Sequence, residues 1–333
     1  MKKRILTGDR PTGKLHLGHL FGSLKNRVAL QEKYETYILI ADVQALTDNF
    51  LTPEKVRENV LEVAMDNLAV GIDPAIATLC IQSLIPEIAE LTVFFSNLVT
   101  ITRLERNPTV KEEIKQKANL FRGGVTMGFL GYPISQAADI LSFRAEVVPV
   151  GADQLPMIEQ TREIARKFNL IYEKTFSLPK AEVSKFPRIK GLDGQSKMGK
   201  SLDNAIFLAD SQQEIELKVM KAFTDPKKIY KNDEGHPLSC AVYQYQSIFS
   251  ENEELVDIKN GCQKGKLGCV ECKKNLMKKT IAYLEPIQNK RHYYEKRPNL
   301  VKEILLTGTK KARKITQETM AIVKKRMKID YFD

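Results

Sequence analysis

The chain has 333 residues, of which 43% are hydrophobic and 28% are charged, and its formal net charge is +11. This balance is that of an ordinary soluble protein, and no apolar run reaches the length needed to span a bilayer. The length suggests two domains, and the basic charge suits a polyanionic partner, because lysine and arginine displace counterions from a phosphate backbone. The N-terminal residues lack the apolar core of a signal peptide, so we expect a cytoplasmic protein.

The first predicted element is a short strand at 4–6, followed by a glycine-bearing loop and a helix. Apolar residues recur at helical spacing from Leu17 onward. His16 and His19 therefore lie where the loop passes into the helix, at the end whose free N–H groups and dipole favour a phosphate. Two imidazoles there can hydrogen-bond phosphate oxygens as negative charge develops in a transition state. The alternative is a pair of surface histidines beside an ordinary loop.

Strands and helices alternate through the rest of the first 168 residues. In chain order the predicted elements are a strand at 37–41, a helix from Pro53, a strand at 77–81, a helix from Pro86, a helix at 132–141, a strand at 147–150 and a helix after Gly151. Apolar strands separated by helices are typical of an α/β, doubly wound parallel sheet of the Rossmann-like kind. Residues 107–124, charged and then glycine-bearing, are predicted to form a crossing loop.

A polar loop at 185–205 contains Lys197 and Lys200, three residues apart and flanked by glycines. Two ammonium groups so placed can clamp a pyrophosphate and neutralise it as it leaves, although a lone pair of this kind is usually just solvated. From Ser211 onward the pattern is helical with almost no strand runs. We therefore predict a catalytic domain at 1–190, and the lysine loop with a helical domain at 191–333.

Taken together, these motifs resemble those of one enzyme class. His16-Leu17-Gly18-His19 resembles the HIGH signature of class I aminoacyl-tRNA synthetases, and residues 197–201 resemble their KMSKS signature, with Gly199 in place of its serine. Further segments are similar to the tryptophanyl-tRNA synthetases, namely residues 69–74, 104–106, 137–141 and 148–154. The resemblance covers nearly the whole chain.

The resemblance implies a nucleotide site in which His16, His19, Lys197 and Lys200 are catalytic. The implied contacts to ATP are Arg10, Thr12, Gly18, His19, Gly151, Asp153, Lys197, Met198, Lys200 and Ser201. Mg²⁺ would bridge the phosphates without a dedicated protein cage. Gly199 and Arg10 depart from the best-known bacterial pattern.

The resemblance also implies a pocket for tryptophan in which Asp139 accepts the indole N–H. A carboxylate is a strong acceptor for that single donor, and the small neighbours Ala137 and Ala138 are expected to let a flat ring approach. The implied lining residues are Gly8, Tyr132, Gln136, Asp139, Ile140, Val148, Val150 and Gln154. Gln136 also departs from the bacterial pattern. A glutamine three residues before the aspartate occurs in tyrosyl-tRNA synthetases too, which keeps tyrosine as the alternative substrate.

Four cysteines lie in the helical region, Cys240, Cys262, Cys269 and Cys272. In a cytoplasmic protein they argue against a disulfide framework. Four converging thiolates can hold a tetrahedral Zn²⁺ or a 4Fe–4S cluster, and free buried thiols are the third possibility. Some tryptophanyl-tRNA synthetases carry such a set and bind an iron–sulfur cluster, so the resemblance favours the 4Fe–4S cluster over zinc.

The resemblance implies an enzyme that activates L-tryptophan with ATP and transfers it to tRNA(Trp), as a homodimer whose nucleic-acid partner is RNA and not DNA. Three alternatives remain. They are a tyrosyl-tRNA synthetase, a non-catalytic RNA-binding protein derived from a synthetase, and a small-molecule nucleotidyltransferase. The last would not explain the basic helical region or the pocket around Asp139.

Overall fold

The computed structural model describes residues 2–183, 189–194, 198–200 and 202–331. The contacts of this described chain form two compact units that are interleaved in sequence. Unit 1 comprises Met1–Gly13, Lys25–Lys185 and Arg297–Asp333, and unit 2 comprises Lys14–Leu24 and Phe186–Lys296. The predicted domains, by contrast, follow one another along the chain and meet at residue 190.

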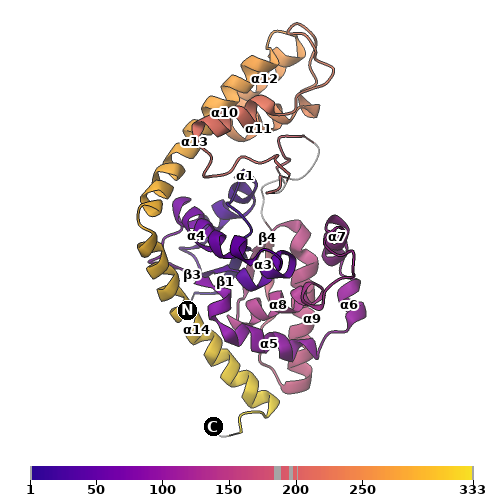
Figure 1. The fold of residues 1–333 in the computed structure, drawn as a ribbon, viewed down its shortest axis with the longest axis vertical. Helices are drawn as coiled ribbons and strands as arrows, with labels where there is room; N and C mark the ends of the chain where they lie inside the picture. The colour runs from indigo at the N-terminus through magenta and orange to yellow at the C-terminus, as the bar shows by residue number, and fades with distance from the viewer. Residues whose placement is uncertain (1, 184–188, 195–197, 201, 332–333) are drawn as a thin grey trace. The chain divides into compact units, whose positions relative to one another are not determined.

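Unit 1 is built on a parallel sheet, which in the described residues has five strands in the order β3-β2-β1-β4-β5 (Figure 1). Its elements in chain order are β1 (Arg4–Asp9), α2 (Lys25–Leu30), β2 (Glu35–Ile40), α3 (Asp42–Asn49), α4 (Pro53–Ala69), β3 (Ala77–Ile81), η2 (Gln82–Leu84), α5 (Pro86–Ser96), α6 (Ile101–Glu105), α7 (Pro108–Gln116), α8 (Met127–Ser142), β4 (Val147–Val150), η3 (Ala152–Gln154), α9 (Leu155–Tyr172), β5 (Lys180–Val183) and α14 (Pro298–Met327). The predicted Rossmann-like α/β fold is confirmed.

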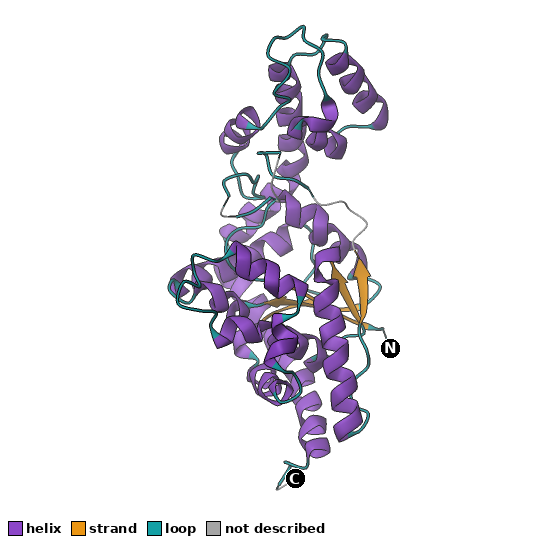
Figure 2. Cartoon of the chain, turned by 90° about the vertical axis from the view of Figure 1, so that its right-hand side faces the viewer, coloured by secondary structure: helices purple, strands orange, loops and turns teal. Residues whose placement is uncertain are grey.

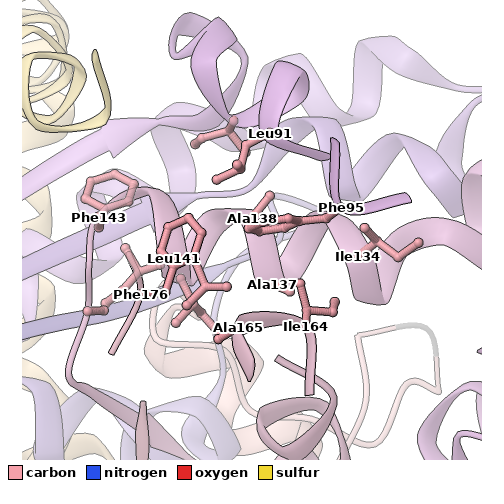
Figure 3. Close-up of a cluster of buried hydrophobic side chains, with 14 of the residues drawn as sticks. Leu91, Phe95, Ile134, Ala137, Ala138, Leu141, Phe143, Ile164, Ala165 and Phe176 are labelled. Carbon is pink, nitrogen blue, oxygen red and sulfur yellow. The ribbon is translucent and has the colours of Figure 1, made fainter. Parts of the chain in front are cut away.

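The main core of unit 1 forms where α8 packs between α5 and α9. Figure 2 shows helices packed around the strands, and Figure 3 shows the apolar side chains of this core gathered in one cluster. Ala137 and Ala138 are fully buried in it, beside aromatic side chains such as Phe95. The two alanines therefore let helices pack closely, and the approach of a flat ring beside them stays a prediction.

One edge of the sheet, strand β3, is covered by α14, the last helix of the chain. The backbone N–H of Ile81 donates to Thr309 Oγ1 at 3.1 Å, so a helix side chain takes up a hydrogen bond that an edge strand otherwise leaves open. A Cβ on Gly308 would lie 2.0 Å from the carbonyl oxygen of Leu79. Glycine at 308 is thus what allows α14 to lie directly on the strand.

A buried ion pair joins the end of β1 to α2. Both oxygens of Asp9 accept from the guanidinium of Arg27, at 2.5 and 3.0 Å, and the two side chains are 7% and 3% exposed. Arg27 also donates to the carbonyl of Gly8 and to Asn67 Oδ1 of α4. The strand end that leads into the glycine-bearing loop is therefore fixed to two helices.

We expect Arg27→Met to lower the free energy of unfolding by about 3–5 kcal/mol, because it leaves the Asp9 carboxylate buried without its partner. The measurement is the midpoint shift in urea unfolding. Arg57→Met, on the exposed side of α4, is the matched control. Equal losses in the two variants would show that the ion pair does not stabilise unit 1.

Unit 2 is helical, as predicted for the region after Ser211. Its elements are α1 (Leu17–His19), the π-helix η1 (Leu20–Leu24), α10 (Gln212–Lys221), η4 (Pro237–Ser239), α11 (Ala241–Phe249), α12 (Asn252–Gln263) and α13 (Cys269–Glu295). Three rings pack η1 onto the helices, since Phe21 lies 5.9 Å from Phe249 and 5.7 Å from Tyr283, between ring centroids. In neither unit do the described residues include a helix long and apolar enough to cross a membrane.

Candidate active site

The histidine loop of unit 2 pairs with the segment that follows the lysine loop. The Leu17 N–H donates to the Ile206 carbonyl at 2.9 Å, and the Leu208 N–H donates to the Leu15 carbonyl at 2.9 Å. This short antiparallel pairing sets His16 opposite Phe207. The histidine loop is therefore held by backbone hydrogen bonds to residues 206–208, which follow the lysine loop within the same unit.

The backbone fixes the tautomers of the two histidines. The Gly18 N–H donates to His16 Nδ1 at 3.1 Å, and the His16 N–H donates to His19 Nδ1 at 3.3 Å. Because a backbone N–H can only donate, each Nδ1 is an acceptor and the proton of each neutral ring is on Nε2. Their ring centroids lie 3.9 Å apart. Each ring can therefore donate from Nε2, as the predicted phosphate chemistry requires.

The lysine loop contacts the histidine loop through Met198, which is 3% exposed. Its sulfur lies 3.3 Å from the Gly18 nitrogen, and a Cβ on Gly18 would be 2.9 Å from the His16 ring. A side chain at residue 18 would therefore displace the His16 ring. Lys200 is partly exposed. The predicted site residues Lys197 and Ser201 lie outside the described residues.

Asn204, which the sequence reasoning missed, organises the backbone around Gly199. Its Oδ1 accepts from the Gly199 N–H at 2.9 Å, and its Nδ2 donates to Asp193 Oδ2 at 2.9 Å. Asn204 is 2% exposed, and a Cβ on Gly191 would collide with it. Gly199, which replaces the serine of the KMSKS signature, therefore has its backbone N–H hydrogen-bonded within the loop. No sequence signal marked Asn204, because its partners Gly199 and Asp193 are brought to it only by the fold of the loop.

The second group of predicted residues lies in unit 1, on α8. Tyr132, Gln136 and Asp139 are spaced four and three residues apart, which places them on one face of the helix. Asp139 is 4% exposed. Burial raises the pKa of its carboxyl to about 8, while the hydrogen bond from Gln82 lowers it and the nearby Asp42 raises it.

Two glutamines that sequence reasoning did not single out hold the Asp139 carboxylate. Gln82 Nε2 donates to Asp139 Oδ1 at 2.7 Å, and Gln44 Nε2 donates to Asp139 Oδ2 at 3.2 Å. The signal that could have found Gln82 is its position, since it is the first polar residue after the apolar strand β3 and so lies at the carboxyl edge of the sheet, where ligands bind.

Several predicted pocket residues lie in or against the core. Ile140 and Val148 are 2% and 5% exposed and belong to the main core of unit 1, and Val150 packs against it. Tyr132 belongs to a second buried cluster, which includes Phe129. Burial raises the pKa of the Tyr132 hydroxyl, as does the nearby Glu113. A role for these residues in lining a ligand pocket stays a prediction.

Arg10, a predicted ATP contact, is paired with Asp48 of α3 at 3.1 Å, and Lys117 reaches the same carboxylate at 2.6 Å. Although burial raises the pKa of Asp48, the two cations beside it hold that pKa below its ordinary value. Arg10 is therefore already oriented by an ion pair at the end of β1.

The remaining predicted residues of unit 1 lie at the carboxyl ends of β1 and β4. A Cβ on Gly8 would be 2.4 Å from the Leu39 carbonyl oxygen, so the close approach of β1 to β2 requires glycine there. A Cβ on Gly151 would be 2.6 Å from Asp153 Oδ1. Thr12 is partly buried in the loop after β1, and Gln154 is the N-cap of α9. Their ligand contacts stay predictions.

The four cysteines of unit 2 act on one another electrostatically. Burial raises the pKa of Cys272 to about 12, and the other three thiols raise it too. The pKa of Cys262 is raised by burial and by Cys240 and Cys269. A Cβ on Gly235 would meet Cys262 Sγ. The thiols thus share one neighbourhood, yet in the described chain no group of three or more His, Cys, Asp or Glu side chains is arranged to hold a metal ion.

A parallel α/β sheet with a paired-histidine loop is what the class I tRNA synthetase motifs predicted, and the family model described as tRNA synthetases class I (W and Y) matches residues 1–285. The tryptophan–tRNA ligase of Clostridium longisporum is 51% identical over 338 residues, which cover 100% of this chain and 98% of that protein. That of Streptococcus mutans is 49% identical and 99% of each chain is covered. The tryptophanyl-tRNA synthetase of Campylobacter jejuni, crystallised with ADP and tryptophan, matches with a TM-score of 0.86 at 32% identity, over 98% of this chain and 99% of that chain. The chain belongs to the class I tRNA synthetases, in the family of tryptophan–tRNA ligases.

Proposed function

We propose that this protein activates L-tryptophan with ATP, forming tryptophanyl-adenylate and pyrophosphate, and then transfers the tryptophanyl group to tRNA(Trp). The observation that supports tryptophan as the substrate is the environment of Asp139. This buried carboxylate lies on the polar face of α8, and each of its oxygens accepts from an amide donor. A site built to accept one N–H rejects analogues that lack it. Around Asp139 we place the predicted tryptophan contacts Gly8, Tyr132, Gln136, Ile140, Val148, Val150 and Gln154.

In the activation step, a carboxylate oxygen of tryptophan attacks the α-phosphorus of ATP. The bond from that phosphorus to the bridging oxygen breaks, and pyrophosphate leaves with the electron pair. The Nε2–H groups of His16 and His19 donate to the phosphate oxygens as charge develops on them, and Lys197 and Lys200 neutralise the leaving pyrophosphate. Mg²⁺ bound to the ATP phosphates would add to the charge neutralisation that Lys197 and Lys200 provide. The chain needs no covalent intermediate of its own.

For the rest of the nucleotide site, we propose the predicted contacts of Arg10, Thr12, Gly18, Gly151, Asp153, Met198 and Ser201. The tightness of the loop around Gly18 and Met198 supports this assignment for the adenine side. The second step moves the tryptophanyl group from the adenylate to a hydroxyl of the terminal tRNA adenosine, the 2′ hydroxyl by family analogy, and AMP leaves.

The test is ATP–pyrophosphate exchange by the purified protein with one aromatic amino acid at a time. Exchange that depends on tryptophan is expected. Exchange with tyrosine alone would overturn the substrate, and no exchange with any amino acid would favour the non-catalytic RNA-binding alternative. Charging of tRNA(Trp) transcript then tests the second step.

We further propose that the helical part of 191–333 reads the anticodon and that the protein is a cytoplasmic homodimer. Exposed apolar side chains at the end of α3 support an interface, since Phe50 and Leu51 are 47% and 74% exposed. Light scattering on the purified protein should give the mass of two chains, and Leu51→Glu should shift it toward one. A single-chain mass for the unmodified protein would overturn the dimer.

For Cys240, Cys262, Cys269 and Cys272 we propose a 4Fe–4S cluster, with Zn²⁺ as the alternative. The support is their shared neighbourhood together with the family resemblance, and thiolates are the ligands that both groups prefer. Protein purified without oxygen should contain iron and sulfide in about equal amounts. Cys272→Ser should lose both, whereas Cys80→Ser, which alters a buried cysteine in β3, should not. Zinc without iron would establish the Zn²⁺ site instead. Protein that contains neither metal would show that the four cysteines are free thiols.

A further inference from the structure

Three elements of unit 1 meet around Asp139. Gln44 lies in α3, Gln82 begins η2 directly after β3, and Asp139 lies in α8. All three side chains are buried, with 9%, 3% and 4% of their surface exposed. The two glutamines are therefore fixed structural partners of the carboxylate and not solvated neighbours.

The orientation of the Gln82 amide follows from the backbone. The backbone N–H of Gln44 donates to Gln82 Oε1 at 3.1 Å. A backbone N–H cannot accept, so the carbonyl oxygen of Gln82 must face it, and the NH₂ group must face Asp139. Gln82 is therefore an obligatory donor to Asp139 Oδ1, at 2.7 Å.

A second contact ties the same two elements together. The N–H of Ser83 donates to Asp42 Oδ1 at 2.9 Å, and the Ser83 hydroxyl donates to Asp42 Oδ2 at 2.5 Å. Asp42 begins α3, and Ser83 follows Gln82. The position of Gln82 relative to Gln44 is thus held from two sides, which keeps the hydrogen bond that orients the Gln82 amide in place.

Both oxygens of Asp139 receive an amide donor, and these two hydrogen bonds stabilise the ionised carboxylate relative to the protonated form. A carboxylate has about four lone-pair sites, so two remain for a ligand. Burial and the nearby Asp42 of α3 work the other way, because both favour the neutral form of Asp139. The Cys80 thiol of β3, whose own pKa is raised by burial and by Asp139, stays neutral. Gln82 is what opposes burial and Asp42 at short range.

Building on the proposed function, we propose that Gln82 is a positioning residue for tryptophan recognition: with Gln44, it holds Asp139 as a pure hydrogen-bond acceptor aimed at the ring N–H of the amino acid. A protonated Asp139 carries a donor of its own and offers a weaker acceptor. Gln82 acts through Asp139, so its loss should affect the reading of the ring N–H and not the binding of ATP.

The decisive variant is Gln82→Glu, which keeps the shape of the side chain and replaces the donor by an oxygen. Two carboxyl groups then share one proton. We expect kcat/KM for tryptophan in pyrophosphate exchange to fall roughly 100-fold, with KM for ATP within about twofold. The preference for tryptophan over benzothienylalanine, in which sulfur replaces the ring N–H, should fall by a similar factor.

A pH profile separates positioning from a structural role. The kcat/KM for tryptophan should rise with pH as Asp139 ionises, and Gln82→Glu should move this rise to higher pH. If Gln82→Glu does not fold, Gln82→Met removes the donor without adding charge, and its preference for tryptophan over benzothienylalanine should fall roughly tenfold.

Gln31→Glu is the matched control. Gln31 is 6% exposed in the same unit and also uses both ends of its amide, donating to the Gly71 carbonyl at 3.0 Å and accepting from the Asp73 N–H at 2.9 Å. Gln31→Glu should lower the stability of the protein but keep its preference for tryptophan over benzothienylalanine and its pH profile of kcat/KM. The inference is overturned if the Gln82 variants also keep this preference and this pH profile, or if they lose tryptophan binding and ATP binding equally. Absence of tryptophan-dependent exchange in the unmodified protein would instead refute the proposed function.

Discussion

Replacing Asp139 by asparagine should lower kcat/KM for tryptophan by roughly two orders of magnitude and leave KM for ATP nearly unchanged. Asparagine turns one acceptor oxygen into an NH₂ group. That group would face an amide donor of Gln82 or Gln44, now 2.7 or 3.2 Å away, and would no longer accept the indole N–H. Steady-state pyrophosphate exchange with tryptophan and with ATP as varied substrates measures both values.

Asp139→Asn also tests how the stability of the folded protein depends on pH. Because burial raises the pKa of Asp139 to about 8, the folded protein holds a proton that the unfolded chain has lost between about pH 4 and pH 8. Folding is therefore penalised progressively as pH rises through this window. Asp139→Asn should lack this fall in stability between about pH 4 and pH 8 while being less active. A control, Asp210→Asn, alters a buried aspartate paired with Lys218 and should show no loss of tryptophan selectivity.

His19→Ala and Lys200→Ala should each lower the rate of tryptophan activation by about 10²–10³, the usual cost of removing one donor to a developing charge. The His19 change removes one of two adjacent Nε2–H donors, and the Lys200 change removes an ammonium from the lysine loop. Single-turnover formation of the adenylate measures the rate directly.

Circular dichroism should show that both variants retain the fold. His292→Ala, an exposed histidine on α13, provides the matched control and should react at the unmodified rate. If His19→Ala and Lys200→Ala react as fast as the unmodified protein, the two motifs are not catalytic and have only a structural role in unit 2.

The sequence predicted those parts of the fold in which local pattern and packing agree. The apolar runs became β2, β3 and β4, and Pro53 and Pro86 begin α4 and α5. Strand β5 was missed, because Lys180–Val183 is a partly exposed edge strand without an apolar run.

The crossing loop predicted at 107–124 was wrong in its first half, which is helix α7. Asn107 caps that helix by accepting from the Thr109 N–H, and Pro108 occupies its first position. This asparagine–proline start was the signal that the charged composition of the segment obscured.

The site was predictable where a motif is continuous in sequence and not where it depends on side-chain partners from other elements. His16, His19 and Asp139 stand in recognisable segments. Gln44 and Gln82 do not, since only the folding of α3 and β3 against α8 gives them a common partner. Likewise, the sequence gives no hint that α14 belongs with the sheet, because its helical pattern continues that of the preceding helices.

The coverage of β3 by α14 has a consequence for synthesis on the ribosome. The strand emerges early, whereas the helix that covers its edge comes from the last part of the chain, Pro298–Met327. Until then the nascent protein carries an open sheet edge, a template for pairing with other chains. A chain stopped before Pro298 should therefore aggregate, because the edge of β3 then has no helix to cover it.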